Sequence, residues 1–159
     1  MNAYELHLAV SLLHARYGQA IDDDRLEDWP EFFTDDCFYS ITSHENHARG
    51  LEAGIVYCDN KGMLKDRVSG LREANIYERH RYRHIVSMPA TVQPVPGGRL
   101  GAKTPFAVYR ITRNKPSELF VTGCWHDELV LGADGQLKIA KRVAVCDSSV
   151  FDTLLAIPL

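Results

Sequence analysis

The chain carries a compact group of possible metal ligands near its middle, in the pattern Glu78-x-His80-x-x-x-His84. Two imidazoles and one carboxylate form the facial triad that holds a non-haem Fe(II) ion. Three arginines alternate with these ligands, at Arg79, Arg81 and Arg83. Guanidinium charges so close repel a divalent cation, and in a strand His80 and His84 would lie ~13 Å apart. We therefore assign no metal ligand to this chain.

The same segment is better suited to contact another protein. Arginine forms bidentate hydrogen bonds with carboxylates and is enriched at protein interfaces. A guanidinium group buried without a partner is costly, so several of them in one segment indicate acceptors on a second chain. We predict a subunit interface formed by Tyr77, Arg79, His80, Arg81, Arg83 and His84.

His84 has a second possible role as a general base. Imidazole titrates near neutral pH, and a neighbouring carboxylate orients the ring for proton transfer. The sequence offers Asp22, Asp36 and Asp147 as partners and does not choose among them. This alternative would make the chain an enzyme by itself.

Cys124-Trp125-His126 has the Cys-x-His spacing of half a Rieske iron–sulfur site. A complete site needs two cysteines and two histidines. Ser149 stands where a Cys-x-x-His motif beginning at Cys146 would have its histidine. We therefore expect no cluster in this chain and read Cys124 and His126 as neighbours on one face of a strand.

The first half of the chain predicts mainly helices. Apolar residues recur at three- and four-residue spacing over residues 6–21 and again over 63–71, which is typical of amphipathic helices. A short helix over 26–33 would place Trp29, Phe32 and Phe33 in the core, and residues 37–42 and 52–58 favour short strands.

The second half predicts a sheet. From His84 onward the sequence reads as four long strands, separated by turns at 94–98, 114–117 and 133–135. Helices followed by long antiparallel strands indicate an α+β fold. We expect one domain over residues 1–159, a curved antiparallel sheet wrapped around the N-terminal helices like a cone. The mouth of such a cone is a pocket, which side chains can also fill.

Composition limits the class of protein. With 159 residues, 45% hydrophobic and 25% charged, the chain is an ordinary globular domain. No segment approaches the roughly 18 apolar residues of a membrane span, and four scattered cysteines favour a reducing cytoplasm. Acidic residues that interrupt the basic stretch 65–84 argue against nucleic-acid binding.

Charge is divided unevenly along the chain. Residues 1–60 have a balance of −9 and residues 61–159 a balance of +6. Opposite patches can steer association between copies or with another subunit, although a solvated mixture of surface charges explains the division equally well.

Four segments share a pattern with one protein family. They are residues 29–37 (Trp-Pro-Glu-Phe-Phe-Thr-Asp-Asp-Cys), 63–67 (Met-Leu-Lys-Asp-Arg), 79–85 (Arg-His-Arg-Tyr-Arg-His-Ile) and 142–148 (Arg-Val-Ala-Val-Cys-Asp-Ser). Together they resemble the small (β) subunit of bacterial aromatic-ring-hydroxylating oxygenases, over essentially the whole chain. Residues 72–80 and 152–159 look most similar to the terephthalate branch, with salicylate, anthranilate and halobenzoate oxygenases as near alternatives.

The resemblance implies a nuclear-transport-factor-two-like cone and a non-catalytic role. It implies a homotrimer of small subunits bound to three large ones, an α3β3 complex. The large subunit would hold a Rieske [2Fe–2S] cluster and a mononuclear Fe(II), and a separate reductase would supply electrons from NADH. No catalytic, cofactor-binding or metal-binding residue is expected in this chain.

Two other classes remain open from the residues alone. One is a dehydratase or isomerase of the same cone fold that uses His84 with an aspartate. The other is a binding protein for a small ligand in the cone pocket.

Overall fold

The computed structural model describes residues 1–51, 54–74, 79–151, 155 and 157–159. Its longest helix, α1 (Ala3–Asp22), begins with a capping box. The Asn2 side chain accepts a hydrogen bond from the Glu5 amide, and the Glu5 carboxylate accepts one from the Asn2 amide. Beyond its end at Asp22, Asp24 has a positive φ of 59°, which turns the chain away from the helix axis. The predicted apolar stripe is confirmed, because Val10, Leu13, Tyr17 and Ile21 are all buried.

Three shorter helices follow. They are the 3-10 helix η1 (Leu26–Phe32), α2 (His44–Ala48) and α3 (Lys61–Ala74). The predicted third helix is thus confirmed, whereas the second is a 3-10 helix containing Pro30 and α2 was not expected. Trp29 and Phe33 lie in the core as predicted, and Phe32 is half-buried against it.

In the described part of the chain, seven strands form one sheet. They are β1 (Phe33–Ser43), β2 (Val56–Cys58), β3 (His80–Val86), β4 (Thr91–Val95), β5 (Arg99–Thr112), β6 (Glu118–Leu131) and β7 (Leu137–Cys146). The strand order is β2-β1-β7-β6-β5-β3, and β4 also pairs with β5. The predicted turns at 114–117 and 133–135 fall between strands, whereas the one at 94–98 begins too early, because β4 continues to Val95.

Two features of the sheet correct the sequence-based expectation. The first of the four predicted runs is two strands, β3 and β4, which pair with different halves of β5. Pro89 lies in the break between them, where its lack of an amide hydrogen costs no ladder hydrogen bond. The sheet is also not wholly antiparallel, because β1 pairs with β7 in parallel, with Tyr39 opposite Arg142.

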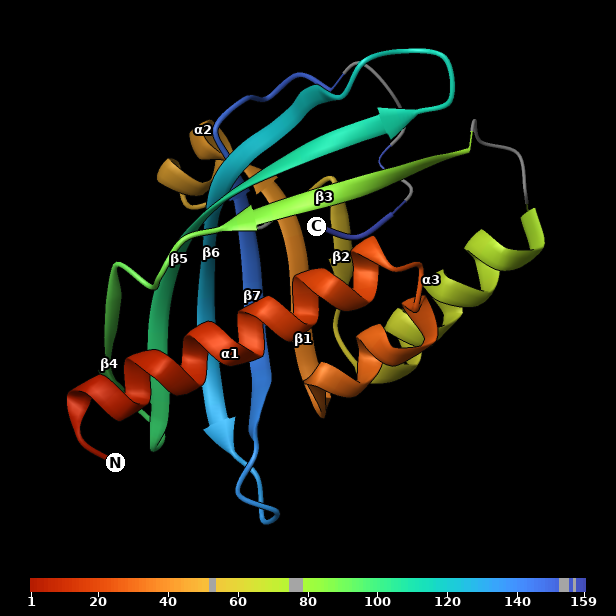
Figure 1. Cartoon of the computed structure of the whole chain (residues 1–159). Coiled ribbons are helices and arrows are strands. Elements are labelled where there is room, and N and C mark those ends of the chain that lie inside the picture. Colours follow the sequence, from red (N-terminus) through yellow and green to blue (C-terminus); the bar gives the residue numbers. More distant parts are fainter. Residues whose placement is uncertain (52–53, 75–78, 152–154, 156) are drawn as a thin grey trace.

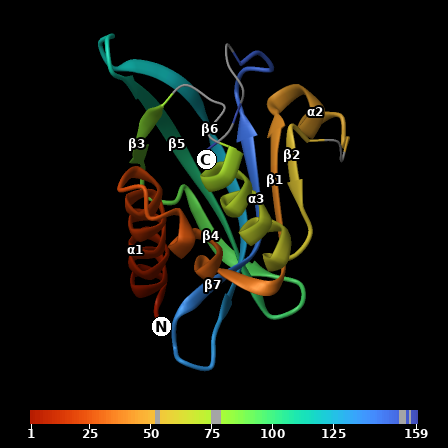
Figure 2. The same ribbon diagram turned by 90° about the vertical axis from the view of Figure 1, so that its right-hand side faces the viewer.

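Helix α1 lies on the inner face of the curved sheet, whereas α2 packs on the other face, with His47 against His126 of β6. In Figure 1, α1 crosses in front of β5, β6, β7 and β1, and Figure 2 shows it standing to one side of the strands. Helix α1 comes very close to β3 at Gly18, where an added Cβ would lie 3.2 Å from the Cβ of His84. A side chain there would require His84 or the helix to shift by a few tenths of an ångström.

The interior of the cone is filled by the chain's own C-terminal segment. Leu155, Ile157 and Leu159 are buried in the core. The hydroxyl groups of Tyr17 and Tyr39 donate to the backbone oxygen of Leu159 at 2.8 and 3.1 Å. The pocket expected in the mouth of the cone is therefore occupied by this segment. No helix in the described part of the chain is long and apolar enough to span a membrane.

Candidate functional site

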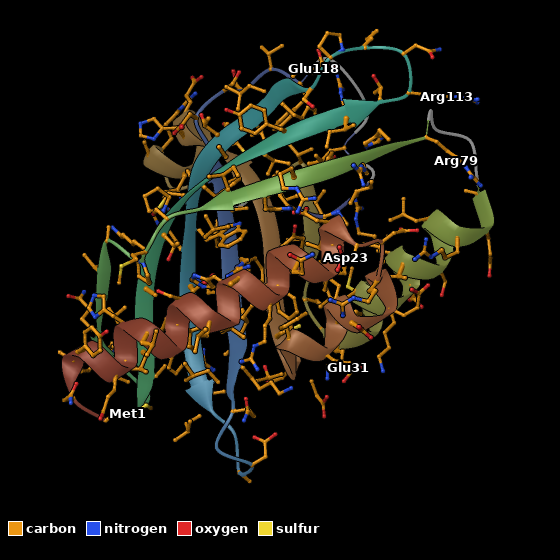
Figure 3. The ribbon with its side chains drawn as sticks, viewed as in Figure 1. Met1, Asp23, Glu31, Arg79, Arg113 and Glu118 are labelled. Carbon is orange, nitrogen blue, oxygen red and sulfur yellow. The ribbon has the colours of Figure 1, made fainter. Side chains whose placement is uncertain are left out.

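Strand β3, at the edge of the sheet, divides the predicted contact segment between two faces. Tyr82 and His84 point inward and are buried, while Arg81 and Arg83 point outward and are exposed. Alternation along a strand explains this division, since successive side chains project to opposite faces. His80 is half-buried, Arg79 is exposed, and Tyr77 and Glu78 lie outside the described residues. Figure 3 shows Arg79 at the far end of β3, at the same end of the molecule as Arg113.

His84 is held by Asp22, one of its three candidate partners. The Nδ1 atom of His84 lies 2.6 Å from Asp22 Oδ1, and the backbone amide of His84 donates to Asp22 Oδ2 at 2.8 Å. Both side chains are almost completely buried. Asp36 is exposed on β1, and Asp147 accepts a hydrogen bond from Thr122 instead. A buried histidine oriented by a carboxylate has the geometry of an acid–base dyad.

A second histidine belongs to a buried charge network that sequence reasoning missed. The guanidinium group of Arg142 donates two hydrogen bonds to Asp127, at 2.8 and 2.6 Å. His14 Nε2 lies 2.8 Å from the same carboxylate. Arg142 is fully buried between two aromatic rings, with its central carbon 3.9 Å from the Trp125 ring centre and 4.2 Å from that of Tyr17.

The pKa values in this network follow from burial and pairing. Burial raises the pKa of Asp127, but the charge and hydrogen bonds of Arg142 outweigh it and lower the pKa to about 2. Burial lowers the pKa of His14 below its ordinary 6.5, and the hydrogen bond to Asp127 offsets this only in part. Asp127 is therefore ionised and His14 neutral at pH 7.

Outward from β3, the arginines lie beside exposed apolar side chains on neighbouring strands. Arg83 is paired with Tyr109 of β5, and Tyr109 with Leu119 of β6. Residues opposite each other in an antiparallel pair share a face. We call these residues the outer patch: Arg81, Arg83, Ile85, Tyr109 and Leu119, all of them exposed. Arginine with aromatic and aliphatic residues is the composition of a protein-contact surface.

The fold separates the cysteines of the Rieske-like motif. Cys124 and His126 share the outer face of β6, where the His126 ring packs on His47 with centroids 4.8 Å apart. Cys146 is paired with Gly123, the residue before Cys124, and so faces the other side of the sheet. Among the described residues, no group of three or more His, Cys, Asp or Glu side chains could hold a metal ion.

The four cysteines are free thiols. Burial raises the pKa of Cys37 to about 11 and that of Cys146 to about 12, so both are protonated at neutral pH. A thiol needs to be ionised to act as a nucleophile or a metal ligand. The buried cysteines therefore serve as small apolar core residues.

Some acidic residues of the first 60 positions form ion pairs with basic residues of the remainder. Lys61 pairs with Glu31 at 3.2 Å, and Arg72 pairs with Asp24 and Glu27 at 2.9 and 2.8 Å. In each pair the acid comes from the first 60 residues and the base from the remainder. The asymmetry alone is therefore no argument for association between copies.

Comparison with known proteins adds to this geometry. The sequence matches a family described as the ring hydroxylating beta subunit over residues 16–153. It is 48% identical to the terephthalate 1,2-dioxygenase terminal oxygenase component subunit beta 1 of Comamonas sp., covering 96% of this chain and 97% of that protein. It is 43% identical to the anthranilate 1,2-dioxygenase small subunit of Burkholderia cepacia, covering 94% and 92% of the two chains.

A solved structure of a beta subunit also resembles this chain along its whole length. The beta subunit of a protein assigned as an aromatic-ring-hydroxylating dioxygenase, from Novosphingobium aromaticivorans, superposes with a TM-score of 0.88. It is 35% identical in sequence, and the match covers 99% of each chain. The similarity therefore extends over the whole cone, including the strands that carry the outer patch and the buried histidines.

Proposed function

The chain belongs to the family of ring-hydroxylating beta subunits, and on this premise we propose that it is the small subunit of a dioxygenase acting on a terephthalate-like aromatic carboxylate. The observation that carries the proposal is the 48% identity to a terephthalate dioxygenase beta subunit over nearly the full length of both chains. The second relative is named for anthranilate, which is also an aromatic carboxylate.

The role proposed for this chain is structural. The cone interior, where a relative of the same fold could hold a substrate, is occupied by Leu155, Ile157 and Leu159. The donor set of the described residues does not fit an iron centre, since Cys124 and Cys146 face opposite sides of the sheet. We place the Rieske [2Fe–2S] cluster and the mononuclear Fe(II) in the large subunit, and the supply of electrons in a separate reductase.

The contact with neighbouring subunits is proposed to include the outer patch and Arg79. Arg79 and Arg81 have no ion pair with any residue that the structure describes, although both are well placed to bind acceptors on another chain. His84 is buried inside the subunit and would support this surface from below. We propose an α3β3 complex, with a homotrimer of this chain, in the cytoplasm. The four unpaired cysteines favour that reducing compartment.

Co-expression tests the proposal. The full chain is produced with and without a terephthalate-type large subunit, and native mass spectrometry and terephthalate oxidation with NADH and reductase are measured. We expect a stable α3β3 species that oxidises the substrate, and no turnover by this chain alone. Failure of the two subunits to associate, or hydration or isomerisation chemistry by the chain alone, would contradict it.

A further inference from the structure

A hollow lies on the outer face of the sheet, between α2 and the strands β1, β2 and β7. Its volume is about 510 Å³, which is in the range of small-molecule sites. In Figure 2, α2 stands beside β1 and β2, and β2 and β3 are opposite ends of the strand order. The hollow is therefore separate both from the outer patch, which begins at β3, and from the filled interior of the cone.

Aromatic and aliphatic side chains line much of this hollow. Phe38 of β1 alternates with the core residue Tyr39 and so projects to the outer face. Its ring meets that of Tyr57 on β2 edge to face, with centroids 5.2 Å apart. Tyr57 and Leu51, which also line the hollow, are each about half exposed, so this surface is open to solvent. Such a surface favours a flat, apolar ring.

Lys141 of β7 supplies a positive charge at the same place. In the sheet it lies between Phe38 of β1 and Glu128 of β6. Glu128 accepts a hydrogen bond from Arg99 at 2.8 Å, whereas the ammonium group of Lys141 lies over the Phe38 ring, 5.7 Å from its centre. No carboxylate of the described residues forms an ion pair with Lys141, which is half-buried. Such an ammonium group favours an anion from outside the chain.

The composition of the lining limits the kind of anion. Among the described residues that line the hollow, Lys141 is the one lysine or arginine, and none is an aspartate or glutamate. A phosphate group is usually bound by several backbone or side-chain donors at once. A single carboxylate instead matches a single ammonium group. An aromatic ring that bears one carboxylate therefore fits both the charge and the apolar walls.

We propose that the hollow between α2 and β1 binds a small aromatic monocarboxylate. The ring packs on Phe38, Tyr57 and Leu51, and the carboxylate accepts hydrogen bonds from the ammonium group of Lys141. The binding is non-covalent. Because the site is formed by this chain alone, the proposal does not depend on the assembly proposed above, and each can fail without the other.

Titration of the full chain with benzoate tests this site. The leucine and valine methyl groups are labelled with ¹³C and followed by NMR. We expect the methyl signals of Leu51 and Val143, which line the hollow, to move because a bound aromatic ring shifts the resonances of nearby protons. Benzamide has nearly the same shape without the charge, and we expect it to bind about fivefold more weakly, the upper size for a solvent-accessible ion pair.

A lysine variant identifies the group that binds the carboxylate. Lys141→Met keeps most of the apolar stem and should weaken benzoate binding by about fivefold, while benzamide binding stays unchanged. Lys115→Met, in the exposed turn between β5 and β6, is the matched control and should change neither affinity. Unmoved Leu51 and Val143 signals at millimolar benzoate would overturn the proposal. Equal affinity of the wild-type chain for benzoate and benzamide, which needs no variant, would also overturn it.

Discussion

The two faces of the sheet differ in how their charged side chains are buried and paired. On the inner face, Asp127 and Arg142 are fully buried and satisfy each other through two hydrogen bonds. On the outer face, Arg81 and Arg83 are exposed beside Tyr109 and have at most a loose ion pair among the described residues. The inner charges are therefore paired with each other within this chain. The outer charges remain available, as expected of a subunit that functions in a complex.

The inner face is where a single substitution should have the largest effect. Arg142→Met leaves the Asp127 carboxylate buried without its charge partner. Breaking a buried pair in this way typically destabilises a protein by about 3–5 kcal/mol. Urea unfolding measures the loss. The control is Arg49→Met, whose side chain is exposed in a 3.6 Å surface pair, and it should change stability by less than about 0.5 kcal/mol.

Assembly should respond to the outer face instead. Arg79→Ala and Arg81→Ala are expected to weaken binding to the large subunit by about 2–4 kcal/mol where the arginine is central to the contact. Circular dichroism and unfolding midpoints should stay at wild-type values. Arg49→Ala again provides the control. Normal assembly of both variants, measured by light scattering, would mean that the contact lies elsewhere on the molecule.

Lowering the pH should reduce the free energy of unfolding, because the buried network of Asp127, Arg142 and His14 loses its pairing. The lowered pKa of Asp127, about 2 against an ordinary 3.8, stabilises the fold above pH 3.8, and this is lost as the pH falls towards 2. The loss amounts to about 2 kcal/mol. His14 adds to it earlier, because its lowered pKa makes the unfolded chain bind a proton first as the pH falls below 6.5. Asp127→Asn should flatten the lower part of the unfolding profile, whereas the exposed Asp35→Asn should not.

The smallest effect is expected for the segment that fills the cone. Tyr39→Phe removes the hydroxyl that donates to the Leu159 backbone oxygen and accepts from its amide, both at 3.1 Å. The loss should be about 1–2 kcal/mol and should speed amide exchange at Leu159. Tyr57→Phe changes an exposed ring and is the control. Unchanged exchange at Leu159 in Tyr39→Phe would show that packing alone holds the segment.

Sequence periodicity predicted most helices and strands correctly, but it did not predict which strands pair in the sheet. The stripe through Leu13 and Tyr17 identified α1, and the turns identified the limits of β5, β6 and β7. The parallel pairing of β1 with β7 could not be predicted from the sequence. Hydrophobic alternation shows which face of a strand is buried, but it does not show which strand lies next to it. The break between β3 and β4 was signalled by Pro89 and overlooked.

The candidate site was predictable in part. His84 was identified, but the choice of Asp22 over Asp36 and Asp147 depended on where α1 crosses β3. The network around Asp127 had a signal that sequence reasoning passed over. Asp127 occupies the same inward positions of its strand as Trp125 and Leu129. A charged residue in such a position needs an opposite charge, and Arg142 on the following strand supplies it.

The parallel pairing of β1 and β7 has a consequence for how the protein folds. Phe38 to Ser43 pair with Lys141 to Cys146, so each residue of β1 pairs with one 103 positions further along the chain of 159. The hairpins β5–β6 and β6–β7 close short loops and can form early, whereas β1 has only the short strand β2 to pair with until β7 exists. Until then α1, η1 and the aromatic side chains of β1 stay exposed. Folding is therefore expected to be slow, with association through the exposed apolar side chains of α1, η1 and β1 as the main competing process.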